Sequence, residues 1–224
     1  MNLGTPEGEG REISGRDLPG WHVDGDFFVH YLDSPEQALL VIPLFTDILP
    51  GGGGTMICPS AMPIVGKHLF DNPDGVSPYM VPRSQDPSMA GEKTLAYFNN
   101  VAKSMPDSAF VEATGNAGDV YLLHPLMLHS ASNNKLRNLR IITNPPVSLN
   151  EPFRFDRENS DDYSLVEKKT IDVLGEASLS GWKITSTRDK IVPARLRAQA
   201  KMKEEELKRL EELRKGQPEV SVQG

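Results

Sequence analysis

The feature that most constrains this chain is a series of short apolar runs, each bounded by glycine, proline or aspartate. Runs of this length between turn-forming residues predict β-strands. No long amphipathic helices alternate with them, which disfavours a doubly wound α/β sheet and favours a sandwich or barrel of short strands. The runs are WHVDGDFFVHYL, ALLVIPLFTDIL, TMICP, DVYLLHPLMLH and LRIITNPPVSL.

Helices are expected at three places. Short helices are predicted near residues 91–103 and 163–174, where apolar side chains recur loosely at helical spacing. Residues 193–216 carry 8 basic and 5 acidic side chains and are rich in strong helix formers. We therefore divide the chain near Pro193 into a domain of residues 1–192 and a charged helical tail of residues 193–224, with the helix ending at Gly216.

The tail helix has two interpretations. Its leucines are only partly in heptad phase, whereas Glu and Lys or Arg recur at i, i+4 spacing, as in the pair Glu204 and Lys208. A solvated single helix is favoured on this pattern. Weak association with a partner or a second copy through residues 193–216 is the alternative.

Composition excludes several classes of protein. The 224 residues carry 24 Lys and Arg against 31 Asp and Glu, a net charge of -7, which disfavours a nucleic-acid binder. The single cysteine, Cys58, can form no intramolecular disulfide. The longest apolar run, residues 38–45, is too short to span a bilayer, and the opening residues lack the blocks of a signal peptide. We expect a cytoplasmic protein without membrane or nucleic-acid partners.

Four successive glycines, residues 51–54, allow two interpretations. A phosphate-binding loop would need a Lys followed by Ser or Thr at the correct spacing and a helix after it, and the sequence has neither. A tight turn between two strands needs only backbone at positive φ, which glycine adopts freely. The turn is the preferred interpretation.

A candidate metal site begins at His22 and Asp24. Alternate residues of a strand point to the same face, so these two side chains can share one ion. A third ligand is expected from His124 or His129, which a strand would send to opposite faces. Two histidines and one carboxylate suit Fe(II), because three coordination positions remain open for a bidentate 2-oxo acid and dioxygen.

A 2-oxo acid cosubstrate with a distal carboxylate would also need a buried guanidinium. Arginine stays charged and can pair with a carboxylate through two hydrogen bonds. Arg137 and Arg140, which follow His124 and His129 in the sequence, are the candidates.

These motifs resemble the phytanoyl-CoA dioxygenase family of Fe(II)- and 2-oxoglutarate-dependent oxygenases, over about residues 21–149. The resemblance rests on the His-x-Asp pair, on GGGGTMICP, and on Gly118-Asp119 followed by HPLMLHSAS and an arginine. It implies a mainly β, double-stranded β-helix core of the jelly-roll or cupin type with peripheral short helices. By resemblance, His22, Asp24 and His129 would bind iron, and Arg140 would hold 2-oxoglutarate.

The resemblance also gives Thr55 a position on a strand that lines the cosubstrate pocket in relatives; the alternative is an ordinary β-branched strand residue. His124, His30 and His68 would then lie outside the metal shell. Core packing is the preferred role for the apolar residues that flank the motifs, Trp21, Phe28, Leu44 and Met127.

Two features depart from the family pattern. Relatives usually read PGSH after the glycine-rich strand, where this chain reads PSAMP from Pro59. Only 21 residues precede His22, whereas relatives carry a longer N-terminal region, so a shortened and non-catalytic version is one expectation to test.

The leading functional hypothesis is a dioxygenase that uses Fe(II), 2-oxoglutarate and O2 to oxidise a small organic substrate and releases succinate and CO2. One alternative is a non-catalytic β-helix scaffold that acts through the C-terminal helix. Another is a cupin-type metal enzyme that shares the ligands but has no need of Arg140. The substrate does not follow from the sequence.

Overall fold

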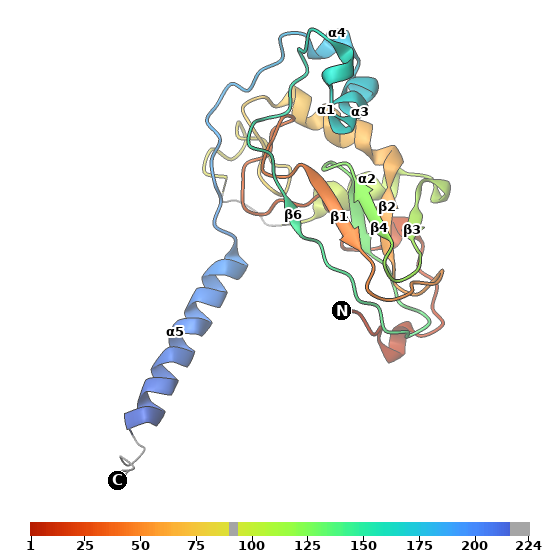
Figure 1. Ribbon diagram of the computed structural model, residues 1–224, viewed down its shortest axis with the longest axis vertical. Coiled ribbons are helices and arrows are strands. Elements are labelled where there is room, and N and C mark those ends of the chain that lie inside the picture. The colour runs from red at the N-terminus through yellow and green to blue at the C-terminus, as the bar shows by residue number, and fades with distance from the viewer. Residues whose placement is uncertain (90–93, 216–224) are drawn as a thin grey trace.

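The computed structural model describes residues 1–89 and 94–215. Its strands form two antiparallel three-stranded sheets, named here after their central strands (Figure 1). The β1 sheet has the order β4-β1-β6 and contains β1 (Leu39–Pro43), β4 (Val120–Leu123) and β6 (Pro146–Val147). The β2 sheet has the order β3-β2-β5 and contains β2 (Thr55–Cys58), β3 (Val111–Ala113) and β5 (Leu128–Ala131).

Isolated bridges extend both sheets. Leu44 pairs with Ile142 beyond the end of β1, and His22 pairs with His129 at the free edge of β5. Ile57 of β2 lies opposite His129 on the other side of β5, so His129 is flanked by backbone on both sides. The first bridge makes the segment after β5 part of the β1 sheet, and the second brings residue 22 to the β2 sheet.

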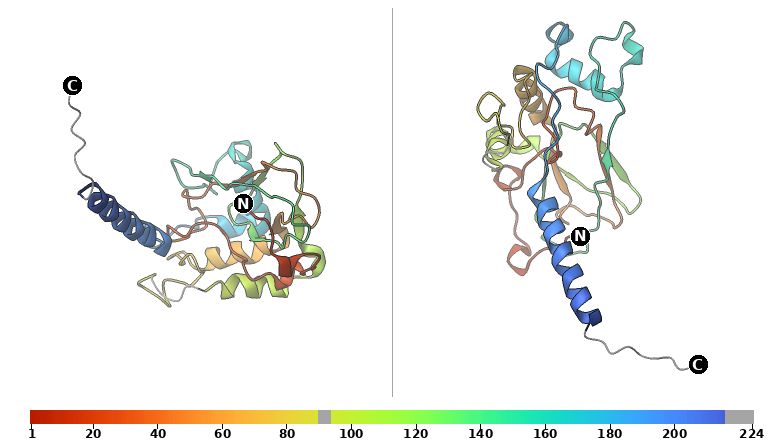
Figure 2. Two further views of the ribbon diagram at one scale, coloured as in Figure 1. Left: turned by 90° about the horizontal axis from the view of Figure 1, so that it is seen from below. Right: turned by 90° about the vertical axis from the view of Figure 1, so that its left-hand side faces the viewer.

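The two sheets lie in successive layers, with β1 and β4 in front of β2 and β3 in Figure 1 and beside them in Figure 2. Leu40, Ile42 and Leu44 are buried and cluster with Ile48. On the opposite face of the same sheet Leu122 is 64% exposed. This alternation follows from the period of two along a strand, and it turns the apolar face of the β1 sheet inward.

Helices cover the other face of the β2 sheet. Cys58 and Leu128 pack in the largest apolar cluster together with Val65, Leu69 and Phe98. The α-helices of the described residues are α1 (Met62–Asp71), α2 (Ala96–Ser104), α3 (Leu165–Leu174), α4 (Glu176–Leu179) and α5 (Ala194–Lys215). Short 3-10 segments are η1 (Pro6–Gly8), η2 (Gly15–Asp17), η3 (Pro59–Ala61), η4 (Asp107–Ala109) and η5 (Ser160–Asp162).

The predicted helix over residues 163–174 is confirmed as α3. A capping box starts it: the Ser164 hydroxyl accepts the Glu167 backbone N–H, and the Glu167 carboxylate accepts the Ser164 backbone N–H. The helix predicted near residues 91–103 is observed as α2, and its residues 91–93 lie outside the described part of the chain.

The sequence did not indicate α1. Pro59 and Pro63 stand near its beginning, where proline is well tolerated because its missing N–H would have no intrahelical partner there. Met62, Val65 and Leu69 then bury one face of α1 at helical spacing.

The strand content is lower than we expected for a mainly β fold. Helical residues outnumber strand residues, and α5 alone has 22 residues. Residues 21–32, expected as a strand, form only isolated bridges at His22, Phe28 and His30. In the described ranges the two sheets are antiparallel and form no closed barrel.

The predicted tail helix is confirmed as α5, which projects away from the body (Figure 1). Its predicted end, Gly216, lies outside the described residues. A search of the described helices finds none that is both long and apolar enough to cross a membrane.

Candidate metal centre

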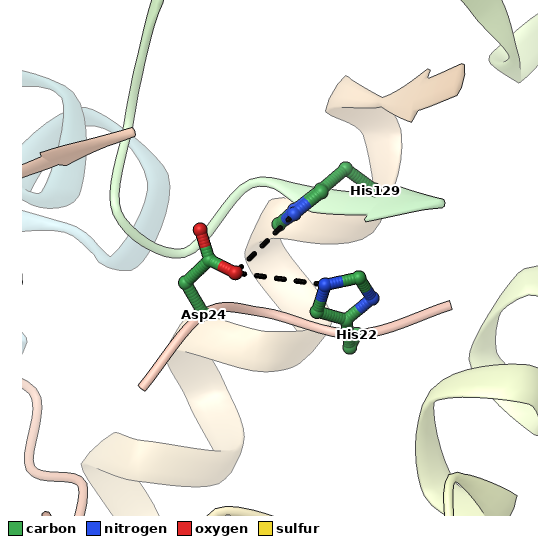
Figure 3. Close-up of side chains that lie close together, drawn as sticks. All are labelled: His22, Asp24 and His129. Atoms are coloured by element: carbon green, nitrogen blue, oxygen red, sulfur yellow. Dashed lines mark ion pairs between the residues drawn. The ribbon is translucent and has the colours of Figure 1, made fainter. Parts of the chain in front are cut away.

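The structure brings His22, Asp24 and His129 together, with one ligand atom from each within 4.8 Å of the others (Figure 3). His22 and His129 form a hydrogen-bonded antiparallel pair, N to O 2.9 and 3.0 Å, which places both imidazoles on one face. Asp24, two residues after His22, points to the same place. A single carboxylate oxygen, Oδ1, lies 3.5 Å from His22 Nε2 and 3.6 Å from His129 Nε2.

Backbone carbonyls orient both imidazoles. His22 Nδ1 lies 2.7 Å from the Gly20 carbonyl and His129 Nδ1 lies 2.9 Å from the Met127 carbonyl. A carbonyl can only accept, so each Nδ1 donates its proton to that carbonyl, and Nε2 is the nitrogen left to face Asp24, where it donates to the carboxylate when protonated and offers a lone pair to a metal when deprotonated. A hydrogen bond from the distant ring nitrogen to a carbonyl is the usual way of orienting a metal-binding histidine.

The charges in the cluster favour a cation. Burial alone would raise the pKa of Asp24, but hydrogen bonds from His129 and His22 lower it well below the ordinary value. Burial would lower the pKa of His22, yet its hydrogen bond to Asp24 raises it. The carboxylate is therefore ionised over the physiological range, and the cluster offers one full negative charge and two nitrogen donors.

Sequence reasoning missed Asn144, whose side-chain amide donates a hydrogen bond to Asp24 Oδ2. Asn144 belongs to the segment that joins the Leu44 to Ile142 bridge to β6. No sequence signal marked it, because the contact joins residues 120 positions apart.

The expectation that only one histidine of residues 124–129 joins the cluster agrees with the geometry. His124 lies away from it: its Nε2 is 3.1 Å from the Thr170 hydroxyl of α3, and its Nδ1 accepts the Leu126 backbone N–H. Burial lowers the pKa of His124 to about 4. His124 is thus a neutral, hydrogen-bonded structural residue.

Arg140 and Thr55 meet between the two sheets. A guanidinium nitrogen of Arg140 donates to the Thr55 hydroxyl at 3.3 Å, and Arg140 is 8% exposed. Its Nε is buried and has no hydrogen-bond partner among the described residues. Arg137, the other candidate, lies at the surface and pairs with Glu9.

The four glycines form a turn, as the sequence predicted. Gly51 and Gly53 have φ of 79° and 81°, which L-residues rarely adopt. The backbone N–H groups of Gly51 and Gly54 bind the two carboxylate oxygens of Glu112 at 2.7 and 2.8 Å. The turn therefore holds a carboxylate of the chain itself and positions β2, on which Thr55 is the first residue.

A cavity of about 470 Å³ opens on the cluster. It is lined by His22 and Asp24, by Tyr79 and Leu95, and by Arg195 at the beginning of α5. Its rim is electrostatically balanced, because Arg195 makes two hydrogen bonds to the Asp26 carboxylate at 2.7 and 2.8 Å. The cavity is large enough for a small organic molecule beside the three candidate ligands.

The remaining histidines named from the sequence lie outside the cluster. His30 is 3% exposed, stacks on Phe28 and is hydrogen-bonded to the Gly25 carbonyl. His68 lies on α1 against the Met80 carbonyl. Of the flanking apolar residues, Trp21, Phe28 and Leu44 are buried in the core, and Met127 is half-buried.

Comparison with known proteins adds no relative. A scan against protein-family models gives no match, and neither a search of curated proteins nor a search of solved structures finds a significant match. The function is therefore argued from the geometry of the site.

Proposed function

We propose that the protein is an Fe(II)- and 2-oxoglutarate-dependent dioxygenase that oxidises a small organic substrate. The observation that carries the proposal is the combination of a two-histidine, one-carboxylate cluster with a buried arginine whose Nε lacks a partner in the described residues. A metal site alone would fit many reactions. A metal site together with an anion-binding guanidinium specifies a charged cosubstrate.

The cluster fits a ferrous ion. Three ligands on one face leave open positions on the other side, and imidazole with carboxylate is the donor set of non-haem Fe(II) oxygenases. His22 and His129 present Nε2 and Asp24 presents Oδ1 toward a common point. His22 and Asp24 also line the open cavity, so a substrate can approach the side not occupied by protein ligands.

Arg140 fits the distal carboxylate of 2-oxoglutarate. Burial of the guanidinium lowers the pKa of Arg140 and the Glu112 carboxylate acts against this, yet arginine remains charged at neutral pH and its buried Nε has no hydrogen-bond partner in the described residues, which is costly. A carboxylate that accepts from Nε would relieve that cost, and the Thr55 hydroxyl would stand beside it.

The arrangement of the sheets also supports a double-stranded β-helix core. In that fold two antiparallel sheets face each other and the site lies between them. Here the contacts of Arg140 with Thr55 and of Asn144 with Asp24 join the segment that continues the β1 sheet to the β2 sheet and its edge. The proposed jelly-roll topology rests on this opposition of the sheets.

When bound, iron and the 2-oxo acid supply the oxidising chemistry, in which O2 is consumed, the cosubstrate becomes succinate and CO2, and a substrate C–H bond is oxidised. The chain's own residues do the positioning. The Gly20 and Met127 carbonyls hold the proton on Nδ1 of each histidine, which keeps Nε2 free to bind metal. Tyr79 and Leu95 line the cavity beside His22 and Asp24 and would pack against one side of the substrate.

The alternative of a cupin-type metal enzyme without a 2-oxo acid uses the same three ligands. It gives no role to Arg140, and the unpaired buried Nε is then a cost without a function. The scaffold alternative accommodates a structural metal in the cluster but leaves Arg140 unexplained. The dioxygenase is favoured because it accounts for both features.

The test is an anaerobic titration of the protein with Fe(II) and 2-oxoglutarate, monitored by the visible charge-transfer band of a 2-oxo acid chelated to ferrous iron. We expect the band in the wild type, and a 2-oxoglutarate affinity about 10-fold to 100-fold weaker in Arg140→Ala, since a charge-assisted hydrogen bond is lost. Arg137→Ala is the matched control, because Arg137 is exposed and paired with Glu9, and it should behave as wild type.

A folded wild-type protein that binds Fe(II) but gives no band with 2-oxoglutarate would favour the cupin-type alternative. A folded protein that binds no divalent metal would favour the scaffold. Equal 2-oxoglutarate affinity in wild type and Arg140→Ala would remove Arg140 from the site.

A further inference from the structure

Asn144 is fixed on both sides by the β1 sheet. Two residues before it, Ile142 pairs with Leu44, and two residues after it, Pro146 pairs with Leu40. Pro145 follows it directly, and a residue before proline is restricted to extended conformations. The backbone of Asn144 is thus held although its side chain is exposed, and the amide reaches Asp24 at the edge of the other sheet.

The contact divides the Asp24 carboxylate into two unequal oxygens. Oδ1 faces both imidazoles, at 3.5 and 3.6 Å from their Nε2 atoms. Oδ2 accepts the hydrogen bond of the Asn144 amide. A carboxylate whose second oxygen is held in this way presents one oxygen to an ion, whereas a free carboxylate can rotate and bind through both.

We infer that Asn144 is a positioning residue that keeps Asp24 a one-oxygen ligand and so leaves the coordination positions not used by the chain free. The inference rests on the proposed metal centre and deepens it. If Asp24 bound through both oxygens, it would occupy one of the three positions that a bidentate 2-oxo acid and O2 require. Asn144 acts through Asp24 and has no assigned contact with the ion itself.

The test uses Co(II) as the probe, because its visible ligand-field absorption reports coordination number and geometry without turnover. The full chain is titrated with Co(II) by calorimetry and by absorption. In Asn144→Ala we expect Co(II) affinity about 10-fold to 100-fold weaker, the usual effect of removing an outer partner of a metal ligand. We also expect an altered Co(II) spectrum, which a purely structural role would not produce.

Two further variants make the test specific. Asn144→Gln keeps the amide donor on a longer side chain and should recover part of the affinity and of the wild-type spectrum. Asn150→Ala changes another exposed asparagine, one that lines a separate groove beside Leu149, and should match wild type. If Asn144→Ala does not fold by circular dichroism, Asn144→Gln against Asn150→Ala still decides the question.

The outcomes separate the inference from the proposed function. Wild-type affinity and spectrum in both Asn144 variants, with wild type binding Co(II), would overturn the role of Asn144 and leave the metal centre standing. Absence of Co(II) binding in the wild type itself would overturn both. Weaker binding with an altered spectrum in Asn144→Ala, and wild-type behaviour in Asn150→Ala, would support the inference.

Discussion

The metal cluster and the helix α5 are stabilised in opposite ways. The metal cluster is built from segments far apart in the chain, as the pairing of His22 with His129 and the bond of Asn144 to Asp24 show. In α5 the described side chains are exposed, and ion pairs such as Lys208 with Glu204 run along the helix itself. The first region depends on long-range packing, and the second on local helix propensity.

The largest effect on stability is expected from a buried leucine of the body. Leu128 is fully buried in the main cluster, directly before His129. Leu128→Ala should lower the free energy of unfolding by about 2–5 kcal/mol, because it removes apolar contacts and leaves a cavity. Urea denaturation monitored by tryptophan fluorescence measures the change. A loss below about 1 kcal/mol would mean that the β2 sheet is not packed as described.

The next effect is on metal binding. Asp24→Ala removes the one carboxylate of the cluster and should weaken Fe(II) or Co(II) binding more than about 100-fold, beyond the usual effect of losing an outer partner. Calorimetric titration of the apo-protein measures it. Asp26→Ala, which changes an acidic residue that lines the same cavity and pairs with Arg195, is the control and should retain the metal. Equal binding in wild type and Asp24→Ala would disprove the cluster.

A moderate effect is expected when the pH is lowered. Burial holds the pKa of His124 at about 4 in the folded chain, below the ordinary value of 6.5, and the positive charge of Lys169 lowers it further. The unfolded chain therefore takes up the proton first, and stability falls from about pH 6.5 toward pH 4 and then levels off. The loss between pH 7 and pH 5 should be about 2 kcal/mol from this group.

Urea denaturation at the two pH values, in wild type and His124→Gln, measures this contribution. The variant should lose less stability on acidification than wild type. The remaining pH dependence includes His30, whose pKa burial also lowers to about 4. An equal loss in both proteins would show that His124 is not held neutral.

The smallest effect on the free energy of unfolding is expected in α5. It is to be compared with the effect of Leu128→Ala. Leu207 is 51% exposed, so Leu207→Ala should change the free energy of unfolding by less than about 0.5 kcal/mol. The same urea experiment applies. A loss comparable to that of Leu128→Ala would show that α5 is covered by a partner or a second copy, and the comparison between the two regions would fail.

The helices α3 and α5 could be predicted because their signals lie within the segments themselves. The apolar spacing of residues 163–174 and the helix formers of α5 are contiguous signals, and the helices they predict are present. The segments of residues 21–32 gave an incorrect strand, because apolar alternation there is satisfied by burial of Trp21 and Phe28 without a continuous ladder. Strand length depends on the partner, which the sequence pattern does not show.

The candidate site was predictable in part for the same reason. His22 and Asp24 share a face through their own spacing, so the sequence alone paired them. Glu112 and Asn144 carried no signal in the sequence. Glu112 binds a glycine about 60 positions away, and Asn144 binds Asp24, which is 120 positions away. Their roles follow from which segments the sheets bring together.

The sequence by itself determined the donor types of the cluster, the two-residue spacing of His22 and Asp24, the turn of residues 51–54 and the helical character of the tail. Each of these depends on a side chain or on the φ that a single residue can adopt. Only the tertiary structure decided that His22 pairs with His129, that Arg140 lies buried beside Thr55, and that Asn144 holds Asp24. Spacing along a strand fixes the face a side chain points to, whereas pairing and packing between distant strands decide what it meets there.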